Sequence, residues 1–259
     1  MSEVRVLLDI RDGVAHATLN NPGNGNAIDV PMAMALRETM LGCEKHANVR
    51  AVVIAGAGKM FCSGGDLRTI RAAEDAPAYV GEILLHLHEA LASIARISAP
   101  VIASVHGSAA GAGFALAIAC DFVVATKSSR FLMAYTAAGL TPDGSSSYFL
   151  PRLIGLRRAL ELTLRNRKLS ADEAREWGLV NDVVEDDALA AHTAKLATEL
   201  ADGPTQAFGN AKRLLRTSLE HSLESQMARE QQTLCNALAQ PEAKAGLAAF
   251  AEKRVPKFR

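Results

Sequence analysis

Short apolar runs alternate with polar, glycine-bearing segments along much of this chain. Residues 4–10 and 14–19 flank Asp12-Gly13 and predict a β-hairpin. Runs rich in β-branched and small apolar residues predict further strands at 51–55, 100–105, 122–125, 131–134 and 180–184. Apolar residues at helical spacing predict helices at 31–45, 76–97 and about 111–119. Because strands and helices alternate, the pattern favours an α/β layer fold.

From residue 146 onward, helical patterns dominate. Ser170 and Glu173 have the spacing of a capping box and predict the start of a helix. Gly178 is suited to end that same helix. The segment Asp202-Gly203-Pro204 is the best boundary, because only helical patterns lie beyond it, at 205–219, 222–238 and a last helix to 253. We therefore expect a core in residues 1–202 and a helical region in residues 203–259.

Composition narrows the class of protein. The 259 residues are 49% hydrophobic and 22% charged, and the formal net charge is +0, so no long-range field favours nucleic acid or an anionic membrane. The cysteines at 43, 62, 120 and 235 lack metal-ligand or redox spacing, which predicts reduced thiols and no metal site. Neither a secretory signal nor a membrane-spanning run is evident, so we expect a cytoplasmic protein.

Two glycine-rich segments, 61–67 and 106–113, each follow a predicted buried strand. Their small residues leave backbone N–H groups accessible, and two such turns can direct two donors at one oxygen, as in an oxyanion hole. The first segment could equally be an ordinary strand-to-helix turn with Asp66 as the N-cap. The second could be close helix packing by small residues, and it lacks the Lys-Ser/Thr ending of a phosphate-binding loop.

Asp143 lies between Pro142 and Gly144, where a helix is expected to start near Ser145. It could be the N-cap of that helix, or a general base or nucleophile presented by a rigid turn. The segment has no Gly-x-Ser-x-Gly elbow, which argues against a serine hydrolase. His86 and His88 lie two apart on the helix 76–97, so they point to different faces and are not a paired metal site.

The order of several motifs resembles the enoyl-CoA hydratase/isomerase (crotonase) superfamily over nearly the whole chain. The motifs are Asn26-Ala27, FCSGGDL, APVIASVHGSAAGAG, CDFVVA, LTPDGSSSYFLPRLIG, LSADEAREWGLV and the ending FAEKR. The resemblance implies a spiral of ββα units followed by helices that form trimers, which often pair into hexamers. It also implies acyl-CoA substrates, with coenzyme A present only as part of the substrate and no separate cofactor.

The resemblance also assigns roles to individual residues. The oxyanion-hole donors would be the N–H groups of Gly65 and Ala112, which would stabilise the enolate of a thioester. Coenzyme A would lie along two segments and meet the C-terminal tail of a neighbouring subunit at its adenine end. The residues so assigned are Asn26, Ala27, Gly65, Asp66, Leu67, Phe250 and Lys253.

The chain departs from the hydratases of this superfamily at two positions. Their two catalytic glutamates fall on Ala115 and Tyr135, neither of which can serve as a carboxylate acid or base. Asp143 instead matches the acidic position of two other branches, the ring-epoxide isomerase of phenylacetyl-CoA degradation and 4-chlorobenzoyl-CoA dehalogenase. The dehalogenase branch also has an aromatic residue at the position of Tyr135 and a histidine at that of His88, which makes both auxiliary candidates.

These observations favour an acyl-CoA isomerase in which Asp143 moves a proton. The alternatives are a hydratase that uses the lone carboxylate, and an Asp143 nucleophile whose aryl- or acyl-enzyme is hydrolysed by water that His88 activates. A non-catalytic protein that binds coenzyme A or RNA is a further alternative, although neutral charge argues against RNA. We expect the acyl pocket to be lined from residues 76–97 and 131–148.

Overall fold

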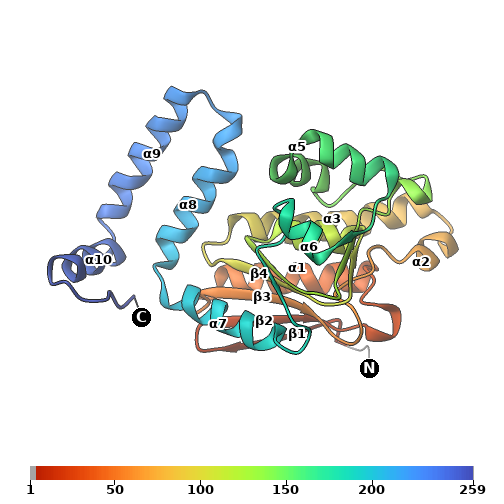
Figure 1. The fold of residues 1–259 in the computed structure, drawn as a ribbon, viewed down its shortest axis with the longest axis horizontal. Coiled ribbons are helices and arrows are strands. Elements are labelled where there is room, and N and C mark those ends of the chain that lie inside the picture. The colour runs from red at the N-terminus through yellow and green to blue at the C-terminus, as the bar shows by residue number, and fades with distance from the viewer. Residues whose placement is uncertain (1–3, 259) are drawn as a thin grey trace.

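The computed structural model describes residues 4–258, and its centre is a six-stranded sheet (Figure 1). In order across the sheet, the strands are β1 (Val6–Arg11), β2 (Val14–Leu19), β3 (Ala51–Gly56), β4 (Val101–Val105), β6 (Phe122–Thr126) and β9 (Asp182–Val184). The first two form the predicted antiparallel hairpin, and each later neighbour is parallel. The alternating α/β order is confirmed.

A second, three-stranded sheet is formed by β5 (Ser108–Ala110), β7 (Arg130–Leu132) and β8 (Leu169–Ser170). Strand β5 lies inside a segment that we had predicted as a turn, because three residues are too few to show an alternating pattern. Strand β7 is shorter than the predicted strand 131–134. It ends at Leu132 and cannot extend to residue 134, because Ala134 has φ 63°, a left-handed conformation that a strand does not contain.

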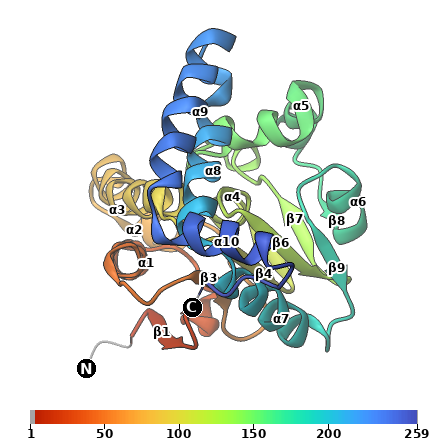
Figure 2. The ribbon, with the colours of Figure 1, turned by 90° about the vertical axis from the view of Figure 1, so that its left-hand side faces the viewer.

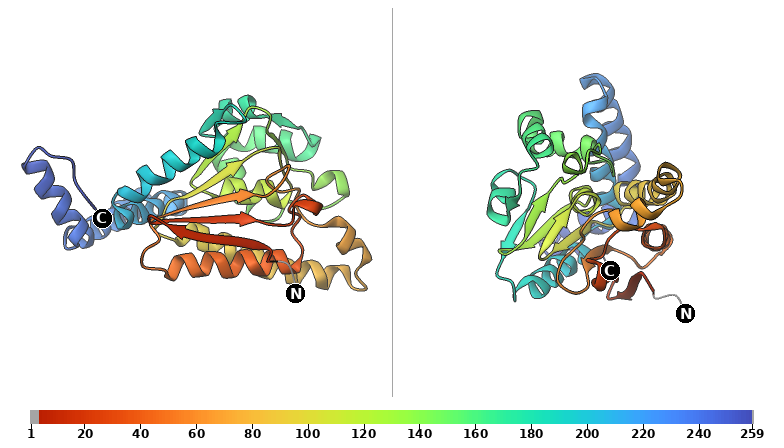
Figure 3. Two further views of the ribbon diagram at one scale, coloured as in Figure 1. Left: turned by 90° about the horizontal axis from the view of Figure 1, so that it is seen from below. Right: turned by 90° about the vertical axis from the view of Figure 1, so that its right-hand side faces the viewer.

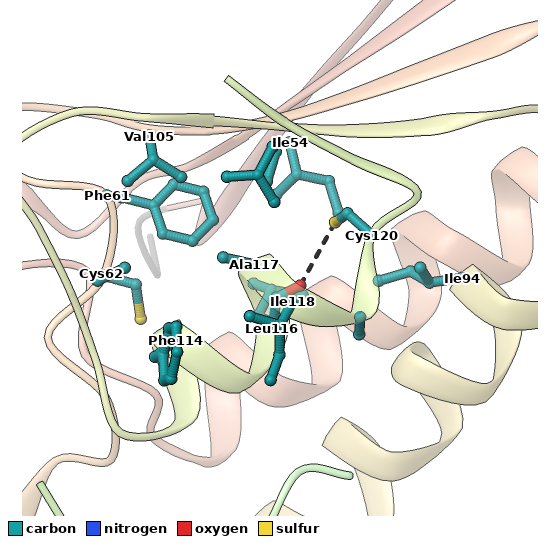
Figure 4. Packing of buried hydrophobic residues seen from close by; sticks show 14 of the residues in the cluster. Ile54, Phe61, Cys62, Ile94, Val105, Phe114, Leu116, Ala117, Ile118 and Cys120 are labelled. Carbon is teal, nitrogen blue, oxygen red and sulfur yellow. Dashed lines mark hydrogen bonds between the residues drawn. The ribbon is translucent and has the colours of Figure 1, made fainter. Parts of the chain in front are cut away.

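Helices cover both faces of the large sheet. On one face lie α1 (Val30–Lys45), α3 (Ala76–Arg96) and α4 (Ala112–Ala119), and on the other lies α7 (Leu189–Asp202). Each face of the sheet has its own hydrophobic core. Successive residues of β3 point to opposite faces, so Val52 and Ile54 pack in the core on the α1 side and Val53 packs in the core on the α7 side. Every residue of α4 is buried, and Figure 4 shows Phe114 and Ile118 of α4 within this core.

Six further α-helices of the described residues complete the fold, three before the last strand β9 and three after α7. They are α2 (Leu67–Ala72), α5 (Ser146–Arg165), α6 (Ala171–Glu176), α8 (Thr205–Thr217), α9 (Leu223–Leu238) and α10 (Pro241–Ala251). Helix α6 begins with the predicted capping box, and α10 ends two residues before the predicted limit. Within residues 4–258, no helix combines the length and apolar character needed to cross a membrane.

Helices α8 to α10 project away from the sheet, and α9 returns alongside α8 (Figures 1, 2 and 3). Helix α8 is fastened to the core at Asp121, whose carboxylate lies 2.6 Å from Lys212 Nζ and 2.9 Å from an Arg216 guanidinium nitrogen. The predicted boundary at 202–204 falls at the junction of α7 and α8. A separate unit from residue 203 onward stays a prediction.

Helix α8 also packs closely on Ser98 through Gly209. A Cβ added at Gly209 would lie 2.5 Å from the Ser98 Cβ and 2.6 Å from its Cα, whereas a Cβ at Gly42 on α1 would meet nothing within 4 Å. We expect Gly209→Ala to lower the free energy of unfolding by about 1–3 kcal/mol through overpacking. Gly42→Ala should raise it by about 0.5–1 kcal/mol through helix propensity. Urea unfolding of both variants tests this, and equal effects would contradict the close contact.

Candidate active site

Two main-chain segments from different parts of the chain run against each other at one end of the strands. The Phe61 N–H donates to the His106 carbonyl at 2.9 Å, and the Cys62 N–H donates to the Ser108 carbonyl at 3.1 Å. The Ala110 N–H returns a bond to the Cys62 carbonyl at 3.0 Å. These bonds join the two glycine-rich segments as a short parallel ladder and hold them at a fixed separation.

Glycine is required where the two segments come closest. Gly64 has φ 97°, and a Cβ there would lie 2.7 Å from the Ala110 carbonyl oxygen. A Cβ at Gly113 would lie 2.5 Å from the Cys62 carbonyl oxygen. Both distances are shorter than real contacts, so a side chain at either position would separate the segments.

This contact places two unpaired amides beside each other. The Gly65 N–H donates to no acceptor in residues 4–258, and neither does the Ala112 N–H, which is the first of helix α4. A helix N-terminus carries partial positive charge, so the Ala112 amide is suited to a developing negative charge. Both residues line one cavity. The predicted pairing of Gly65 and Ala112 is thus consistent with the geometry, and their catalytic role stays a prediction.

The cavity has a volume of about 260 Å³ and an apolar wall. Helix α3 supplies aliphatic side chains to that wall, and the segment 134–143 supplies Tyr135, Leu140 and Asp143. Both regions that we expected therefore contribute to the lining, together with the two glycine-rich segments, Ile28 and α2. The α3 residues involved are Val80, Ile83, Leu84 and Leu87.

Asp143 is the one carboxylate among the described residues that line this cavity. Burial raises its pKa, while a hydrogen bond from the Tyr135 hydroxyl and the nearby His88 act in the opposite direction. The Tyr135 Oη lies 2.5 Å from Asp143 Oδ1. A carboxylate whose pKa is raised by an apolar surrounding is a stronger base than one in water.

The alternative that Asp143 caps helix α5 is wrong. Ser145 occupies the N-cap position, and only the Asp143 main-chain carbonyl serves the helix start, accepting from the Ser146 N–H at 3.0 Å and its hydroxyl at 2.6 Å. The Asp143 carboxylate is turned to Tyr135 instead. His88 is exposed and does not line the cavity, so it acts on Asp143 through charge rather than contact.

The residues that were predicted to lie along coenzyme A have different surroundings in the structure. Asn26 is fully buried, accepts from the Asn21 N–H, and donates through Nδ2 to the carbonyls of Ala57 and Met60. It also lies within reach of the Phe61 carbonyl. Its side chain thus fixes the start of the first glycine-rich segment rather than facing the cavity.

Ala27 is also buried and does not line the cavity. Asp66 is the N-cap of α2, where its carboxylate accepts from two backbone N–H groups, so the alternative that we considered for it is right. Leu67 is exposed and lines the cavity with Gly65. Contact of these residues with coenzyme A stays a prediction.

Phe250 and Lys253 lie at the C-terminal end of the structure, where Phe250 is 85% exposed. Figures 1 and 3 place α10 at the opposite end of the molecule from α2, which carries part of the cavity wall. Within one chain, these two residues therefore do not reach the cavity. The expected contact with the substrate requires a second copy of the chain.

Comparisons with known proteins agree with this geometry. The protein-family profile described as Enoyl-CoA hydratase/isomerase matches residues 9–259. The chain belongs to this family. A crystal structure of an enoyl-CoA hydratase from Polaromonas sp. JS666 superposes with a TM-score of 0.93 at 34% identity, covering 98% of this chain and 99% of that one. The fold implied by the resemblance is thereby confirmed.

Curated relatives within the family carry different activities. The 1,2-epoxyphenylacetyl-CoA isomerase of Escherichia coli K12 is 34% identical, over 98% of this chain and 97% of its own length. The 4-chlorobenzoyl coenzyme A dehalogenase-2 of an Arthrobacter species is 32% identical, over 98% of this chain and 93% of its own length. Similar overall identity to an isomerase and a dehalogenase means that the reaction has to be argued from the site.

Sequence reasoning missed the bond between Tyr135 and Asp143. The two residues were singled out separately, but only the loop between them decides whether their side chains meet. Ala134 and Thr141 also line the cavity; both fall in the expected range 131–148 but were not singled out within it. Alanine at a positive φ cannot be recognised from residue type, because alanine rarely adopts that conformation.

Asn26 offers a test of how the first segment is held. We expect Asn26→Ala to lower the free energy of unfolding by about 2–4 kcal/mol, because several buried polar groups lose their partner. Asn20→Ala, which removes one exposed bond to Val4, should change it by less than about 1 kcal/mol. Chemical denaturation measures both variants, and equal losses would argue against this role.

Proposed function

We propose that this protein is an acyl-CoA isomerase that uses Asp143 as its acid and base. The observation that carries the proposal is one carboxylate facing an apolar cavity whose wall also contains the two unpaired amides of Gly65 and Ala112. A thioester carbonyl held by these amides would gain negative charge when a proton leaves the adjacent carbon. Each preorganised donor of this kind contributes roughly 3–4 kcal/mol to the transition state.

The proposed reaction moves one proton and shifts one double bond. The Asp143 carboxylate removes a proton from C2 of a 3-enoyl-CoA, and the electron pair of that C–H bond delocalises onto the thioester oxygen. The resulting dienolate takes the proton back from Asp143 at C4. The double bond then lies between C2 and C3, so nothing is oxidised or reduced and no water is consumed.

A hydratase fits the cavity less well. Syn addition of water by two carboxylates would need a second acid, and the two hydratase positions hold Ala115 and Tyr135. Position 115 is enclosed, because a Cβ built on the neighbouring Gly144 would already lie 3.0 Å from the Ala115 Cβ. This crowding supports isomerase over hydratase chemistry.

Substitution by an Asp143 nucleophile is the second candidate function. It is favoured by the charge interaction between His88 and Asp143 and by the dehalogenase relative. Its second step would require His88 to activate a water molecule at the bond to Asp143. His88 lies outside the cavity lining, which supports the isomerase instead.

We also propose that the acyl group is uncharged. Helices α2 and α3 contribute aliphatic side chains to the cavity wall, and neither lysine nor arginine is among the described lining residues. A second carboxylate on the substrate would lose its hydration there without gaining a partner, which is unfavourable by several kcal/mol. Acyl-CoA thioesters with short, neutral chains fit this surface.

The proposed assembly is a homotrimer, which could pair into a hexamer. Exposed leucines on α8 and α9 support it, since Leu215 and Leu234 are 74% and 63% exposed. The distance of Phe250 and Lys253 from their own cavity also supports contact with a neighbouring subunit. The free thiols of the four cysteines suit the cytoplasm that we expect for the protein.

Asp143→Asn tests the proposed function directly. We expect kcat for a 3-enoyl-CoA to fall by roughly 10²–10⁴-fold with little change in KM, because the amide cannot accept the proton. Asp187→Asn, at an exposed site outside the cavity, should leave kcat unchanged. Formation of the conjugated 2-enoyl product, followed by absorbance, measures both variants.

This assay and three further measurements separate the alternatives. Near-wild-type turnover by Asp143→Asn would remove Asp143 from the mechanism. A covalent aryl- or acyl-adduct on Asp143, detected by mass spectrometry, would favour substitution. Incorporation of labelled water into crotonyl-CoA would favour a hydratase, and failure of any acyl-CoA to exchange an α-proton would favour a binding protein.

The acyl specificity has its own test. We expect kcat/KM for a neutral 3-enoyl-CoA to exceed that for an analogue with a terminal carboxylate by at least about 10²-fold. Leu84→Lys should narrow this ratio by placing a cation in the wall, whereas Leu85→Lys should not, because Leu85 is 66% exposed and outside the cavity lining. Equal ratios in the wild type and Leu84→Lys would contradict the proposed acyl class.

A further inference from the structure

Tyr135 and Asp143 meet although they come from different parts of an irregular segment. Tyr135 follows β7 and begins a short 3₁₀ turn, while Asp143 precedes α5. The phenol donates to Asp143 Oδ1 at 2.5 Å. Asp143 Oδ2 has no hydrogen-bond partner among the described residues, and Asp143 lines the cavity.

The backbone directs Tyr135 toward this position. The Tyr135 N–H donates to the Met133 carbonyl at 2.8 Å, which closes a three-residue turn around Ala134 at φ 63°. This γ-turn is uncommon and strained for a residue with a side chain. The Tyr135 carbonyl then accepts from the N–H groups of Ala138 and Leu140, both at 3.0 Å. Backbone strain of this kind is concentrated at functional sites.

We propose that Tyr135 is a positioning residue for Asp143, whose phenol holds Oδ1 and leaves Oδ2 as the atom that takes and returns the substrate proton. This inference rests on the proposed isomerase function and deepens it. The phenol fixes the carboxylate in one rotamer beside the substrate. It takes the place of the second carboxylate that a hydratase would carry at this position.

The electrostatics of the pair agree with this division of roles. Burial, together with the negative Asp143, raises the pKa of the Tyr135 phenol, so the phenol stays protonated and donates. Its hydrogen bond lowers the pKa of Asp143 against the larger effect of burial. The other titratable groups acting on the pair are His88, which favours the ionised Asp143, and Cys62, which has a minor raising effect on the pKa of Tyr135.

The test is the pH profile of Tyr135→Phe. Activity requires the ionised carboxylate and is lost as pH falls through the pKa of Asp143. Without the phenol, that pKa should rise by about one unit, so the acidic limb of kcat/KM should move to higher pH by the same amount. At low pH the loss of activity should therefore be about tenfold larger than the loss at high pH. Tyr148→Phe is the control, since its hydroxyl bonds Arg216 and Glu220 away from the cavity.

A second substitution keeps the test informative if Tyr135→Phe folds poorly. 3-Fluorotyrosine at position 135 is a stronger donor of nearly the same size, so it should move the acidic limb to lower pH. His88→Gln in the same assay removes the other charge that acts on Asp143. An acidic limb that stays in place with both replacements at position 135 would overturn the proposal, even if turnover fell.

A measurement without turnover separates this proposal from the proposed function. Carbon-13 NMR of the Asp143 carboxyl should give a higher pKa in Tyr135→Phe than in the wild type. That shift would show that the phenol acts on the Asp143 carboxyl, whatever the activity of Asp143→Asn. Retained activity of Asp143→Asn would overturn the isomerase mechanism, and with it the assignment of Oδ2 as the proton carrier. The same Asp143 pKa in both proteins would overturn the positioning role alone.

Discussion

The contact between main-chain segments 61–65 and 108–112 is the constraint on which the rest of the structure depends. Hydrogen bonds between the segments set their spacing, and the missing side chain at Gly64 lets them approach. The Asn26 side chain binds the start of the first segment, and the buried helix α4 continues directly from the second. If the segments separated, the two unpaired amides could not be directed at one acceptor, and Asp143 would face an apolar cavity without them.

Asp143 is held between two opposing effects. The apolar wall disfavours its charge, whereas Tyr135 and His88 favour it. A carboxylate left without these partners would have a still higher pKa, and one surrounded by more donors would have a lower pKa and be a weaker base. Of the two partners, the Tyr135 phenol has the larger effect on the pKa of Asp143, so the irregular loop that carries Tyr135 matters as much as the regular elements around it.

Much of the fold and part of the site could be predicted from the sequence, because strands such as 101–105 are short apolar runs and α3 has a clear apolar face. Gly65, Ala112 and Asp143 were each identified in advance, and they do share one cavity. The direction of the Asp143 side chain could not be predicted. It depends on the positive φ of Ala134 and on contacts made across the loop, neither of which produces a periodic pattern in the sequence.

The unpaired amides have a consequence for how such a protein can diverge. Ala112 contributes its main-chain N–H, so exchanging its methyl group for hydrogen would leave the donor intact, whereas Gly64 admits no replacement. Mutations can therefore replace acidic side chains such as Asp143 and the aliphatic residues of the cavity wall while the two main-chain N–H groups stay in place. Proteins named as an isomerase, a dehalogenase and a hydratase are similar to this chain at about one third identity, as expected if side chains can change while the main chain of the site is retained.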